Sequence, residues 1–182
     1  MFIRSERLFL RPAWPEDCEE LIALITEEAV LRDVAAMQWP YTIDAARRFI
    51  AGPRERLLPH FFITLPTADG ARPIGSIGLG KNGSDVEIGF WIAHRHWRQG
   101  YATEATRAVL GLARAIGHRR IVATHIADNM ASARVLEKAG FSRIGETRLQ
   151  AAPGCSGDRP AITFAADLGE LCGDDDPVMR AA

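Results

Sequence analysis

DVEIGFWIAHRHWRQGYATEATRAVLGLARAIG, residues 85–117, is the stretch that decides the fold of this chain. Apolar side chains stand at every second position from Val86 to Ile92, which predicts a buried β-strand. After a polar, glycine-containing turn the period becomes helical, and Gly117 ends the pattern. The apolar face of the expected helix comprises Ala102, Ala105, Val109, Leu112, Ala113 and Ile116. The stretch therefore predicts a strand, a tight turn and a long amphipathic helix in direct succession.

The turn between this strand and this helix, Arg98 to Thr103, has the properties of an anion site. The first backbone N–H groups of a helix have no partner inside the helix, and the helix dipole places positive partial charge at the same end. A helix that starts directly after a strand and a glycine-containing turn aims several of these groups at one spot. We therefore expect the turn to bind an anion, and a phosphate group best of all.

Apolar periodicity and turn residues place the remaining elements. They predict strands over residues 5–11, 61–65, 74–79, 120–126, 143–148 and 161–167. Pro15 opens one helix at its first position, and Thr42 is the N-cap of a second helix that runs to about Ala51. Asn129 starts a third helix, which stops at Gly140. The central strand and the two strands before it are expected to form an antiparallel meander, because only short turns join them.

The composition indicates one globular domain. The chain has 182 residues, of which 47% are hydrophobic, and this suffices for one well-packed core but not for two ordinary domains. We expect the domain to span residues 1–172, and residues 173–182 to form an acidic, solvated tail. The formal net charge of −1 gives no electrostatic reason to expect nucleic-acid or membrane binding.

The cysteines and histidines argue against disulfides and metals. Cys18, Cys155 and Cys172 are odd in number, far apart and without CxxC spacing, which fits a reducing cytoplasm better than a disulfide scaffold or a zinc ribbon. His94 and His96 have no third ligand in a matching context, so no metal site is predicted. No segment approaches the roughly 18 apolar residues that a membrane span needs. The expected localisation is cytoplasmic.

Three blocks of the sequence together resemble one known family. Glu87 to Ile92 followed by Gly100 to Ala105 is similar to the acetyl-CoA-binding core of the GNAT superfamily of N-acetyltransferases. Asn129 to Ser132 with Glu137 to Phe141 forms the second block, and Glu6 to Pro12 forms the third. The blocks lie in the family's order and spacing. The set is most similar to the branch of ribosomal-protein alanine N-acetyltransferases.

The resemblance implies a fold and a cosubstrate. The fold class is α/β: the GNAT fold, a twisted, mainly antiparallel sheet of about seven strands with helices on both faces. The cosubstrate is acetyl-CoA, whose pantetheine chain pairs with the edge of the central strand where that strand splays from its neighbour. Its expected contacts are Phe90, Trp91, Ile92, Arg98, Gln99, Gly100, Tyr101, Ala102, Thr103, Asn129 and Ser132. Trp97 and Ala102 depart from the superfamily pattern, but a cradle of backbone N–H groups does not depend on these side chains.

The resemblance also implies roles in catalysis. Glu87 occupies the position of a carboxylate that deprotonates the amine, often through water, although a solvent-facing residue that balances an arginine would look the same. The backbone N–H near Ile92 is expected to donate to the oxyanion. Asn129 is expected to contact the pantetheine arm, and Ser132 to protonate the departing thiolate. Asn129 and Ser132 equally fit the plain start of a helix, and Glu104 is expected to support the start of the central helix.

These residues favour an acetyl-CoA-dependent N-acetyltransferase that acts by direct transfer, because no cysteine lies in a matched nucleophile position. The acceptor is a protein N-terminal α-amine or a small-molecule amine, and the sequence leaves both open. Met37, Trp39 and Tyr41 either face this acceptor or cover the edge of the core. The rival functions are a non-catalytic acyl-CoA sensor and a binding module for another phosphate ligand. The chain is expected to be a monomer or a homodimer, with no nucleic-acid or membrane partner.

Overall fold

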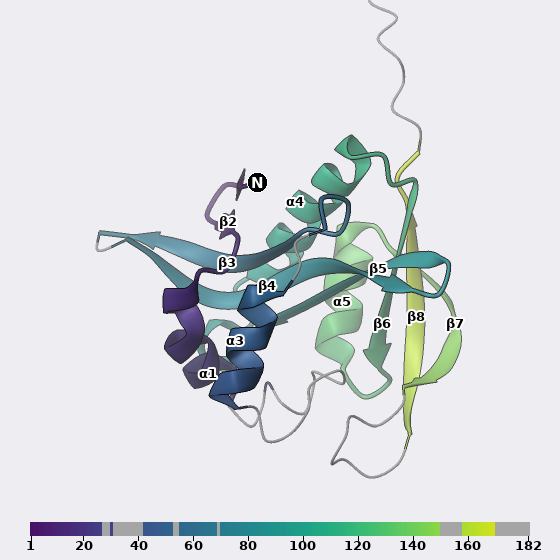
Figure 1. The fold of residues 1–182 in the computed structure, drawn as a ribbon. Coiled ribbons are helices and arrows are strands. Elements are labelled where there is room, and N and C mark those ends of the chain that lie inside the picture. The colour runs from purple at the N-terminus through teal and green to yellow at the C-terminus, as the bar shows by residue number, and fades with distance from the viewer. Residues whose placement is uncertain (27–29, 31–41, 53–54, 69, 150–157, 170–182) are drawn as a thin grey trace, which may run out of the picture.

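The fold is a single sheet with helices packed on both of its faces (Figure 1). It is seen in a computed structural model, which describes residues 1–26, 30, 42–52, 55–68, 70–149 and 158–169. The strands are β1 (Ile3–Arg4), β2 (Phe9–Arg11), β3 (His60–Thr67), β4 (Gly70–Asn82), β5 (Asp85–Ile92), β6 (Arg120–Ile126), β7 (Ser142–Leu149) and β8 (Arg159–Asp167). The helices are α1 (Cys18–Ile25), α3 (Ile43–Ala51), α4 (Tyr101–Ala115) and α5 (Met130–Ala139), with short 3-10 helices η1 (Pro15–Asp17) and η2 (His94–His96).

The strands follow the order β1-β2-β3-β4-β5-β6-β8-β7. Every neighbouring pair is antiparallel except β5 and β6, and the predicted meander of β3, β4 and β5 is present. The last strand, β8, lies between β6 and β7. The predicted fold class is confirmed: a mainly antiparallel sheet with helices on both faces, with eight strands among the described residues where about seven were expected.

The prediction of one continuous strand over residues 5–11 is wrong. The chain turns between Ser5 and Leu8, where the Ser5 N–H donates to the Leu8 carbonyl oxygen (3.0 Å), and only β2 pairs with β3. The residues before the turn form the short β1, which pairs with β2. A tertiary contact explains the turn, because Ser5 and Arg7 bind a carboxylate on α4 instead of a neighbouring strand.

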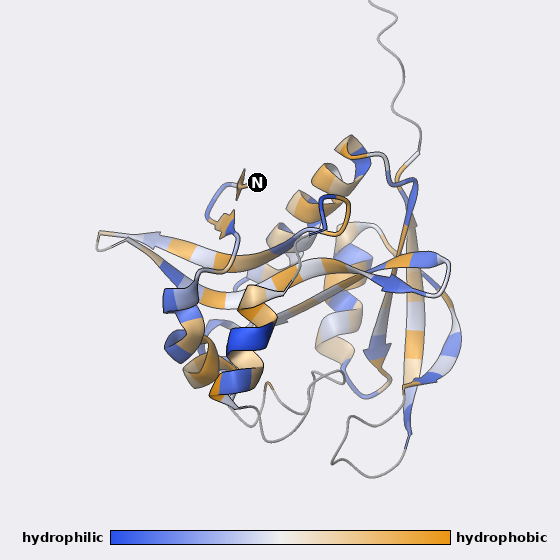
Figure 2. Ribbon diagram, viewed as in Figure 1, coloured by the Kyte–Doolittle hydropathy of each residue, from blue (hydrophilic) through white to orange (hydrophobic). Residues whose placement is uncertain are grey.

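Two hydrophobic clusters, one on each face of the sheet, hold the layers together. The larger joins α4 and α5 to the sheet and includes Val109, Ile121 and Leu136, each at most 1% exposed. The smaller joins α1 and α3 to the sheet around Leu21 and Phe62. Figure 2 shows the corresponding pattern, in which hydrophobic and hydrophilic residues alternate along β3, β4 and α3. Each such large apolar side chain, once buried, contributes about 1.5–3 kcal/mol to folding.

The helix ends follow the signals in the sequence. The Thr42 hydroxyl accepts a hydrogen bond from the Ala45 N–H (3.2 Å), which makes Thr42 the N-cap of α3 as predicted. Gly117 and Gly140 follow α4 and α5 with φ of 100° and 98°, the left-handed conformation in which glycine commonly ends a helix. Phe141 then packs into the larger cluster.

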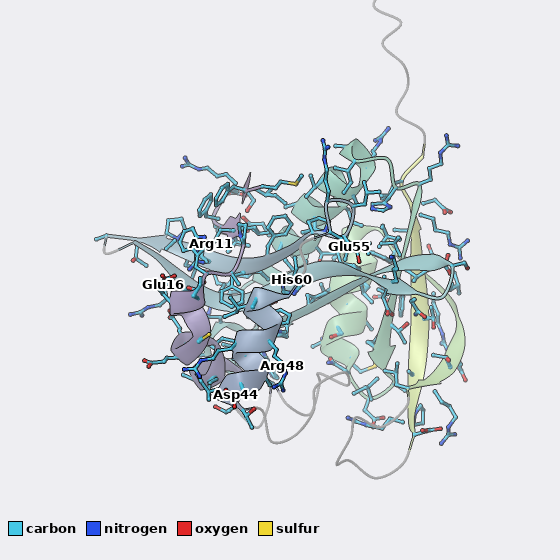
Figure 3. All side chains as sticks on the ribbon, in the orientation of Figure 1. Arg11, Glu16, Asp44, Arg48, Glu55 and His60 are labelled. Carbon is cyan, nitrogen blue, oxygen red and sulfur yellow. The ribbon has the colours of Figure 1, made fainter. Side chains whose placement is uncertain are left out.

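A buried ion pair fixes the path from β2 into α1. The Arg11 guanidinium donates to both carboxylate oxygens of Asp17 (2.7 Å each), and the two side chains are 4% and 8% exposed. Asp17 also accepts from the Trp14 N–H (2.6 Å). Figure 3 places Arg11 at the top of this helical layer, whereas the outer side of α3 carries the exposed Asp44 and Arg48. Arg11, which belongs to the N-terminal sequence block from Glu6 to Pro12, therefore has a structural role.

Several expectations concern residues outside those that the structure describes. Met37, Trp39 and Tyr41 lie there, as does the acidic segment 173–182, so the predictions about them stay predictions. Within the described residues, no helix is long and apolar enough to cross a membrane. The same residues contain no group of three or more His, Cys, Asp or Glu side chains that could hold a metal ion.

Candidate active site

The central strand β5 is fully paired along one edge and largely open along the other. On one side it pairs with β4 over its whole length, residues 85–92. On the other side it meets β6, and in these two fully described strands the pairing is limited to Glu87 opposite Val122. Beyond Glu87 the two parallel strands part. This leaves the edge of β5 over residues 89–92 without a described partner strand.

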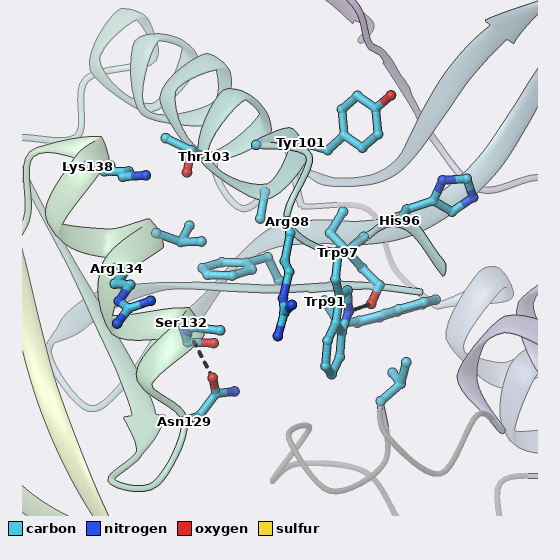
Figure 4. Close-up of a pocket in the computed structure, with 17 residues that line it drawn as sticks. Trp91, His96, Trp97, Arg98, Tyr101, Thr103, Asn129, Ser132, Arg134 and Lys138 are labelled. Atoms are coloured by element: carbon cyan, nitrogen blue, oxygen red, sulfur yellow. Dashed lines mark hydrogen bonds between the residues drawn. The ribbon is translucent and has the colours of Figure 1, made fainter. Parts of the chain in front are cut away.

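A cleft of about 520 Å³ opens where the strands part (Figure 4). Its walls are the end of β5, the turn before α4, the first turn of α4 and one side of α5 as far as Lys138. A volume of this size is typical of small-molecule sites. Arg98, Arg134 and Lys138 line the cleft, and its described lining contains no Asp or Glu, although the chain carries a net charge of −1. The cleft is therefore locally positive and suits an anionic ligand.

The start of α4 is not capped by a side chain. Its N-cap is Gly100, which has a φ of 79° and therefore a left-handed backbone, and no described side chain accepts a hydrogen bond from the first turn. The first three helical residues, Tyr101, Ala102 and Thr103, line the cleft. Figure 4 shows the Tyr101 ring turned away from the cleft, and the Arg7 guanidinium lies 4.7 Å from its centre. The uncapped N–H groups make this turn a candidate phosphate cradle.

Ser5, Arg7 and Glu104 form a strap that holds this turn against the N-terminal corner of the sheet. The Glu104 carboxylate accepts hydrogen bonds from the Ser5 hydroxyl, the Arg7 N–H and the Arg7 Nε, each 2.8 Å long. Arg7 also donates to the Gln99 carbonyl oxygen (3.0 Å). Burial raises the pKa of Glu104, but the hydrogen bonds from Arg7 and Ser5 and the charge of Arg7 outweigh it and hold this pKa below its ordinary value. Glu104 thus supports the start of α4.

At the end of β5, the main-chain N–H and C=O of Ile92 point away from β4. The Ala93 N–H donates to the Ile74 carbonyl oxygen on β4 (2.8 Å). Because successive residues of a strand point to opposite edges, the N–H and C=O of Ile92 face the opposite side, where β6 has departed. Its carbonyl oxygen accepts from the indole N–H of Trp97 (2.6 Å). Trp97, which departs from the superfamily pattern, thus ties the chain just before the α4 turn to the strand edge.

The start of α5 is capped by its own residues. Asn129 Oδ1 accepts a hydrogen bond from the Ser132 N–H (2.9 Å), shown as a dashed line in Figure 4. Both side chains line the cleft, and no described residue bonds the Asn129 amide nitrogen or the Ser132 hydroxyl. The cations Arg134 and Lys138 follow on the same helix and line the cleft as well.

Glu87 does not line this cleft. It lies partly buried at the position where β5 and β6 part. Strand alternation puts its side chain on the same face as Trp91, which packs against the α1 and α3 cluster, and on the opposite face from Ile88. Trp91 follows Glu87 by four residues, a distance of about 13 Å along an extended strand. A role for Glu87 at the cleft therefore needs bridging water.

Most of the cofactor contacts predicted from the sequence come together at the cleft. Those that line it are Phe90, Trp91, Ile92, Arg98, Gly100, Tyr101, Ala102, Thr103, Asn129 and Ser132. Gln99 does not line it, because its carbonyl oxygen accepts from Arg7 and its side-chain amide donates to the Arg95 carbonyl oxygen (3.4 Å). The lining residues that sequence reasoning did not assign to the cofactor are Val30, Trp97, Ala131, Arg134, Val135 and Lys138.

Comparisons with known proteins agree with this fold. Among solved structures, the GNAT-family acetyltransferase from Bacillus anthracis is 25% identical, with a TM-score of 0.77 over 92% of this chain and 99% of that one. RimL, a ribosomal L7/L12 α-N-protein acetyltransferase in complex with coenzyme A, has the same fold at 20% identity, with a TM-score of 0.76 over 92% of this chain and 98% of RimL.

Sequence comparison identifies the family. Uncharacterized N-acetyltransferase YoaA from Bacillus subtilis is 31% identical over 153 residues, which cover 80% of this chain and 85% of YoaA. The family described as Acetyltransferase (GNAT) domain matches residues 7–142, which include β5, the turn before α4, and α5. With a match over most of its length, this chain belongs to the GNAT family and is an acetyltransferase.

Proposed function

We propose that this protein transfers an acetyl group from acetyl-CoA to a primary amine by direct attack of the amine on the thioester. One observation carries the proposal. The uncapped start of α4, the open edge of β5 and a lining with three cations and no described carboxylate meet at a single cleft. The helix start suits the diphosphate of the coenzyme, and the strand edge suits its amide-containing arm. The cationic lining suits the negative charge of the whole molecule.

The residues present fit acetyl-CoA. The N–H groups of Gly100 to Thr103 would hold the diphosphate, since small residues and an uncapped helix start let a phosphate approach the backbone. The main chain of Phe90 would pair with an amide of the pantetheine arm, as an added strand does, which leaves the Ile92 N–H for the thioester oxygen. The RimL structure, which shares this fold, was solved with coenzyme A.

The chain offers a group for each step of direct transfer. Glu87, acting through water, takes a proton from the ammonium group of the acceptor, which then has a lone pair for attack. The C–N bond forms at the thioester carbonyl carbon, and the Ile92 N–H donates to the oxygen that gains negative charge. The C–S bond then breaks, and the Ser132 hydroxyl gives its proton to the departing thiolate, while the second proton of the attacking nitrogen replaces the one that Ser132 gave up. The products are an acetamide and the free thiol of coenzyme A.

The acceptor is proposed to be either a protein N-terminal α-amine or a small-molecule amine. The name of RimL gives a ribosomal protein as the acceptor of that enzyme, which supports the first choice. An amine panel that includes peptides with N-terminal Ala, Ser and Met, read out by release of free coenzyme A, decides between them. Turnover of one small amine with none of any peptide would remove the first choice.

The Glu87→Gln variant tests the reaction. Loss of a general base lowers kcat by about 10²–10⁴-fold, whereas coenzyme A affinity measured by calorimetry is expected to stay unchanged. Glu137→Gln is the matched control, because Glu137 is an exposed residue of α5 outside the cleft lining. This variant should keep the wild-type kcat and the wild-type affinity for coenzyme A. Turnover of Glu87→Gln at the wild-type rate would remove Glu87 from the proposed role.

Titration with several ligands separates this function from its rivals. We expect the wild-type protein to bind coenzyme A more tightly than ATP, because ATP has no arm that pairs with the edge of β5. A preference for ATP would overturn the proposal. Tight binding of acetyl-CoA without turnover of any amine would instead favour a non-catalytic acyl-CoA sensor.

A further inference from the structure

One face of the central strands carries a glycine floor, formed by Gly78, Gly80 and Gly89. Gly78 of β4 lies opposite Gly89 of β5, and Gly80 lies opposite Glu87. Gly80 and Gly89 are exposed, and apart from their chain neighbours no described atom lies within 4 Å of a Cβ atom added to either. Glycine inside a strand often marks a place where a ligand approaches the backbone closely. The glycines provide room but do not identify a ligand, and the side chains around them do.

The imidazole of His60 stands at the β3 side of the glycine floor, next to α3 (Figure 3). His60 pairs with Gly78, and its ring lies so close that a Cβ atom at Gly78 would be 2.2 Å from His60 Cδ2. Its Nε2 is 3.0 Å from the Ser76 Oγ, and the Phe49 ring meets it edge to face with 4.7 Å between ring centres. Although part of His60 stays exposed, burial of the ring lowers its pKa to about 4, so the ring is uncharged at neutral pH.

Ser76 determines which nitrogen of His60 carries the proton. Ser76 is 2% exposed, and within the described residues its hydroxyl has no partner other than His60. A buried hydroxyl donates where an acceptor is present, so the Ser76 O–H is the donor and His60 Nε2 the acceptor. The proton of the uncharged ring then lies on Nδ1, which has no partner among the described residues. His60 therefore has a neutral N–H donor on the ring edge that is left for a ligand.

Gly89 connects this donor to the coenzyme cleft and to Glu87. Trp91 lines the cleft and also packs against the α1 and α3 cluster, so the cleft reaches this face of the sheet. Gly89 lies between Trp91 and Glu87 on the same face of β5, and the His60 ring over Gly78 is one strand away, about 5 Å. Glu87 has no hydrogen bond or ion pair with a described residue. A molecule over Gly89 thus has the cleft at one end, a free carboxylate at the other and an N–H donor at its side.

We propose that the acceptor lies over Gly89 and that the His60 Nδ1–H donates a hydrogen bond to a carbonyl oxygen beside the reacting amine. This inference rests on the proposed function and names a class of acceptor within it. An amino acid amide or the N-terminus of a peptide can form this bond, whereas a simple alkylamine cannot. His60 is a positioning residue, because its hydrogen bond aims the amine at the thioester, and Ser76 keeps the donor on Nδ1.

Two probes of the same shape test this hydrogen bond. Alaninamide has a carboxamide where 3-methylbutan-2-amine has an isopropyl group, so only alaninamide has an oxygen for His60. His60→Ala should lower kcat/KM for alaninamide about tenfold and leave kcat/KM for the alkylamine unchanged, while the KM for acetyl-CoA stays at the wild-type value. Each variant is compared with the wild type on the same probe, so the different basicities of the two amines cancel.

A conservative variant and a control separate the N–H donor from the fold. The amide nitrogen of asparagine can occupy the place of Nδ1, so His60→Asn should recover most of the loss with alaninamide. His118→Ala is the matched control, because His118 Nε2 also has a hydrogen-bond partner, the Leu57 carbonyl oxygen (2.6 Å), but lies outside the cleft lining. This control should keep the wild-type kcat/KM for both probes.

A side chain at Gly89 tests the place of the acceptor. Gly89 has no positive φ, so Gly89→Val fits the strand and fills the space over the floor. The melting temperature and the Kd for coenzyme A should hold, whereas kcat/KM for alaninamide should fall about tenfold to 100-fold, because the amine is displaced. Gly111→Ala adds a side chain in open space on the exposed side of α4, and as the control it should keep the wild-type kcat/KM.

The contrary results separate this inference from the proposed function. Wild-type kcat/KM of His60→Ala on alaninamide, equal losses for the two probes, or no recovery in His60→Asn would overturn the inference. A wild-type protein that acetylates other amines but not alaninamide would also overturn it, and so would full activity of Gly89→Val. All of these results leave the proposed function intact, whereas a wild-type protein that acetylates no amine of the panel would remove both proposals together.

Discussion

The helices α4 and α5 both begin at the same cleft, but their first N–H groups are satisfied in different ways. α5 starts at Asn129, whose Oδ1 accepts from the Ser132 N–H (2.9 Å). α4 starts at Gly100, which has no side chain to offer, and its nearest carboxylate, Glu104, is bound instead by Ser5 and Arg7. One helix start is therefore closed by its own cap, and the other is open.

This difference favours the start of α4 as the place for the phosphate of the proposed coenzyme. An open helix start needs an acceptor, and a ligand phosphate supplies one with a charge that the helix dipole favours. At α5 the cap engages the Ser132 N–H, and the Asn129 amide nitrogen and the Ser132 hydroxyl at the same helix start suit an uncharged arm and its sulfur better than a phosphate. The strap from Arg7 replaces the missing cap of α4 as a support without occupying its N–H groups.

The largest effect is expected when the start of α4 is given a negative charge of its own. In Thr103→Asp the new carboxylate lies in the first helical turn, where it stabilises the ligand-free helix by about 0.3–1 kcal/mol. It also repels the diphosphate, by about 3 kcal/mol for one charge pair some 6 Å apart at an effective dielectric constant of about 20. Calorimetry should therefore show coenzyme A binding weakened by roughly 100-fold or more.

Thr103→Asn is the control for this experiment, because it has nearly the same shape as aspartate without the charge. It should keep most of the affinity. Equal losses in the two variants would show that bulk and not charge disturbs the turn. Full affinity in Thr103→Asp would contradict the placement of the phosphate at α4.

A smaller effect is expected at Asn129, where two substitutions separate capping from ligand binding. Asn129→Ala removes the cap of α5 and should lower the free energy of unfolding by about 1 kcal/mol. Asn129→Asp keeps an oxygen for the Ser132 N–H, so the stability should hold, but it replaces the amide donor with a carboxylate and should raise the KM for acetyl-CoA about tenfold. An unchanged KM in Asn129→Asp would show that Asn129 caps α5 and does not bind the ligand.

The elements that border the cleft were predictable because local pattern and tertiary structure agree there. β5, α4 and α5 lie close to their expected bounds, since hydrophobic period and terminal glycines such as Gly117 and Gly140 are local signals. Arg134 and Lys138 were also within reach of sequence reasoning. They lie four residues apart on a helix whose first residues were already assigned to the site, and residues with this spacing share a helix face.

The features that sequence reasoning missed depend on distant partners or on strain. The segment from Ser5 to Arg11 was expected to be one strand, but Ser5 and Arg7 turn toward Glu104, which lies 97 residues beyond Arg7. The left-handed φ of Arg98 has no local signal, because arginine does not favour this conformation. The position of Glu87 outside the cleft lining depends on where β6 departs from β5, and that is settled by the packing of the whole sheet.

A modest effect is expected at Ser132, whose side chain takes no part in the cap of α5. Ser132→Ala should leave stability unchanged and lower kcat about tenfold near neutral pH, because the thiolate then leaves without a proton donor. A thiol has a pKa of about 8.5, so the thiolate needs less help as the pH rises toward that value, and the deficit should shrink. The kcat of both proteins is to be compared across this pH range. A loss of kcat in Ser132→Ala that is independent of pH would contradict the role of Ser132 as the general acid.

The smallest effect is expected in the strap that supports the open start of α4. The pKa of Glu104 is lower in the folded protein than its ordinary value, so its charged form contributes stability that is fully present above that ordinary value. This stability is lost as the pH falls through the lower, folded value. Glu104→Gln should therefore reduce the free energy of unfolding at neutral pH by about 1 kcal/mol or less, because Arg7 is partly exposed and the pair is screened.

The pH dependence of this difference decides whether the strap acts through charge. Denaturation of the wild type and of Glu104→Gln, followed from neutral pH into acid, should show two curves that approach each other below the ordinary glutamate pKa and meet below the lower, folded value, where the wild-type carboxylate is protonated in both states. Glu146→Gln, in the exposed pair with Arg143, is the control and should stay close to the wild type throughout. A gap that persists in acid would mean that Glu104 acts through shape. The start of α4 would then be held by packing, and the contrast with α5 would be one of geometry and not of charge.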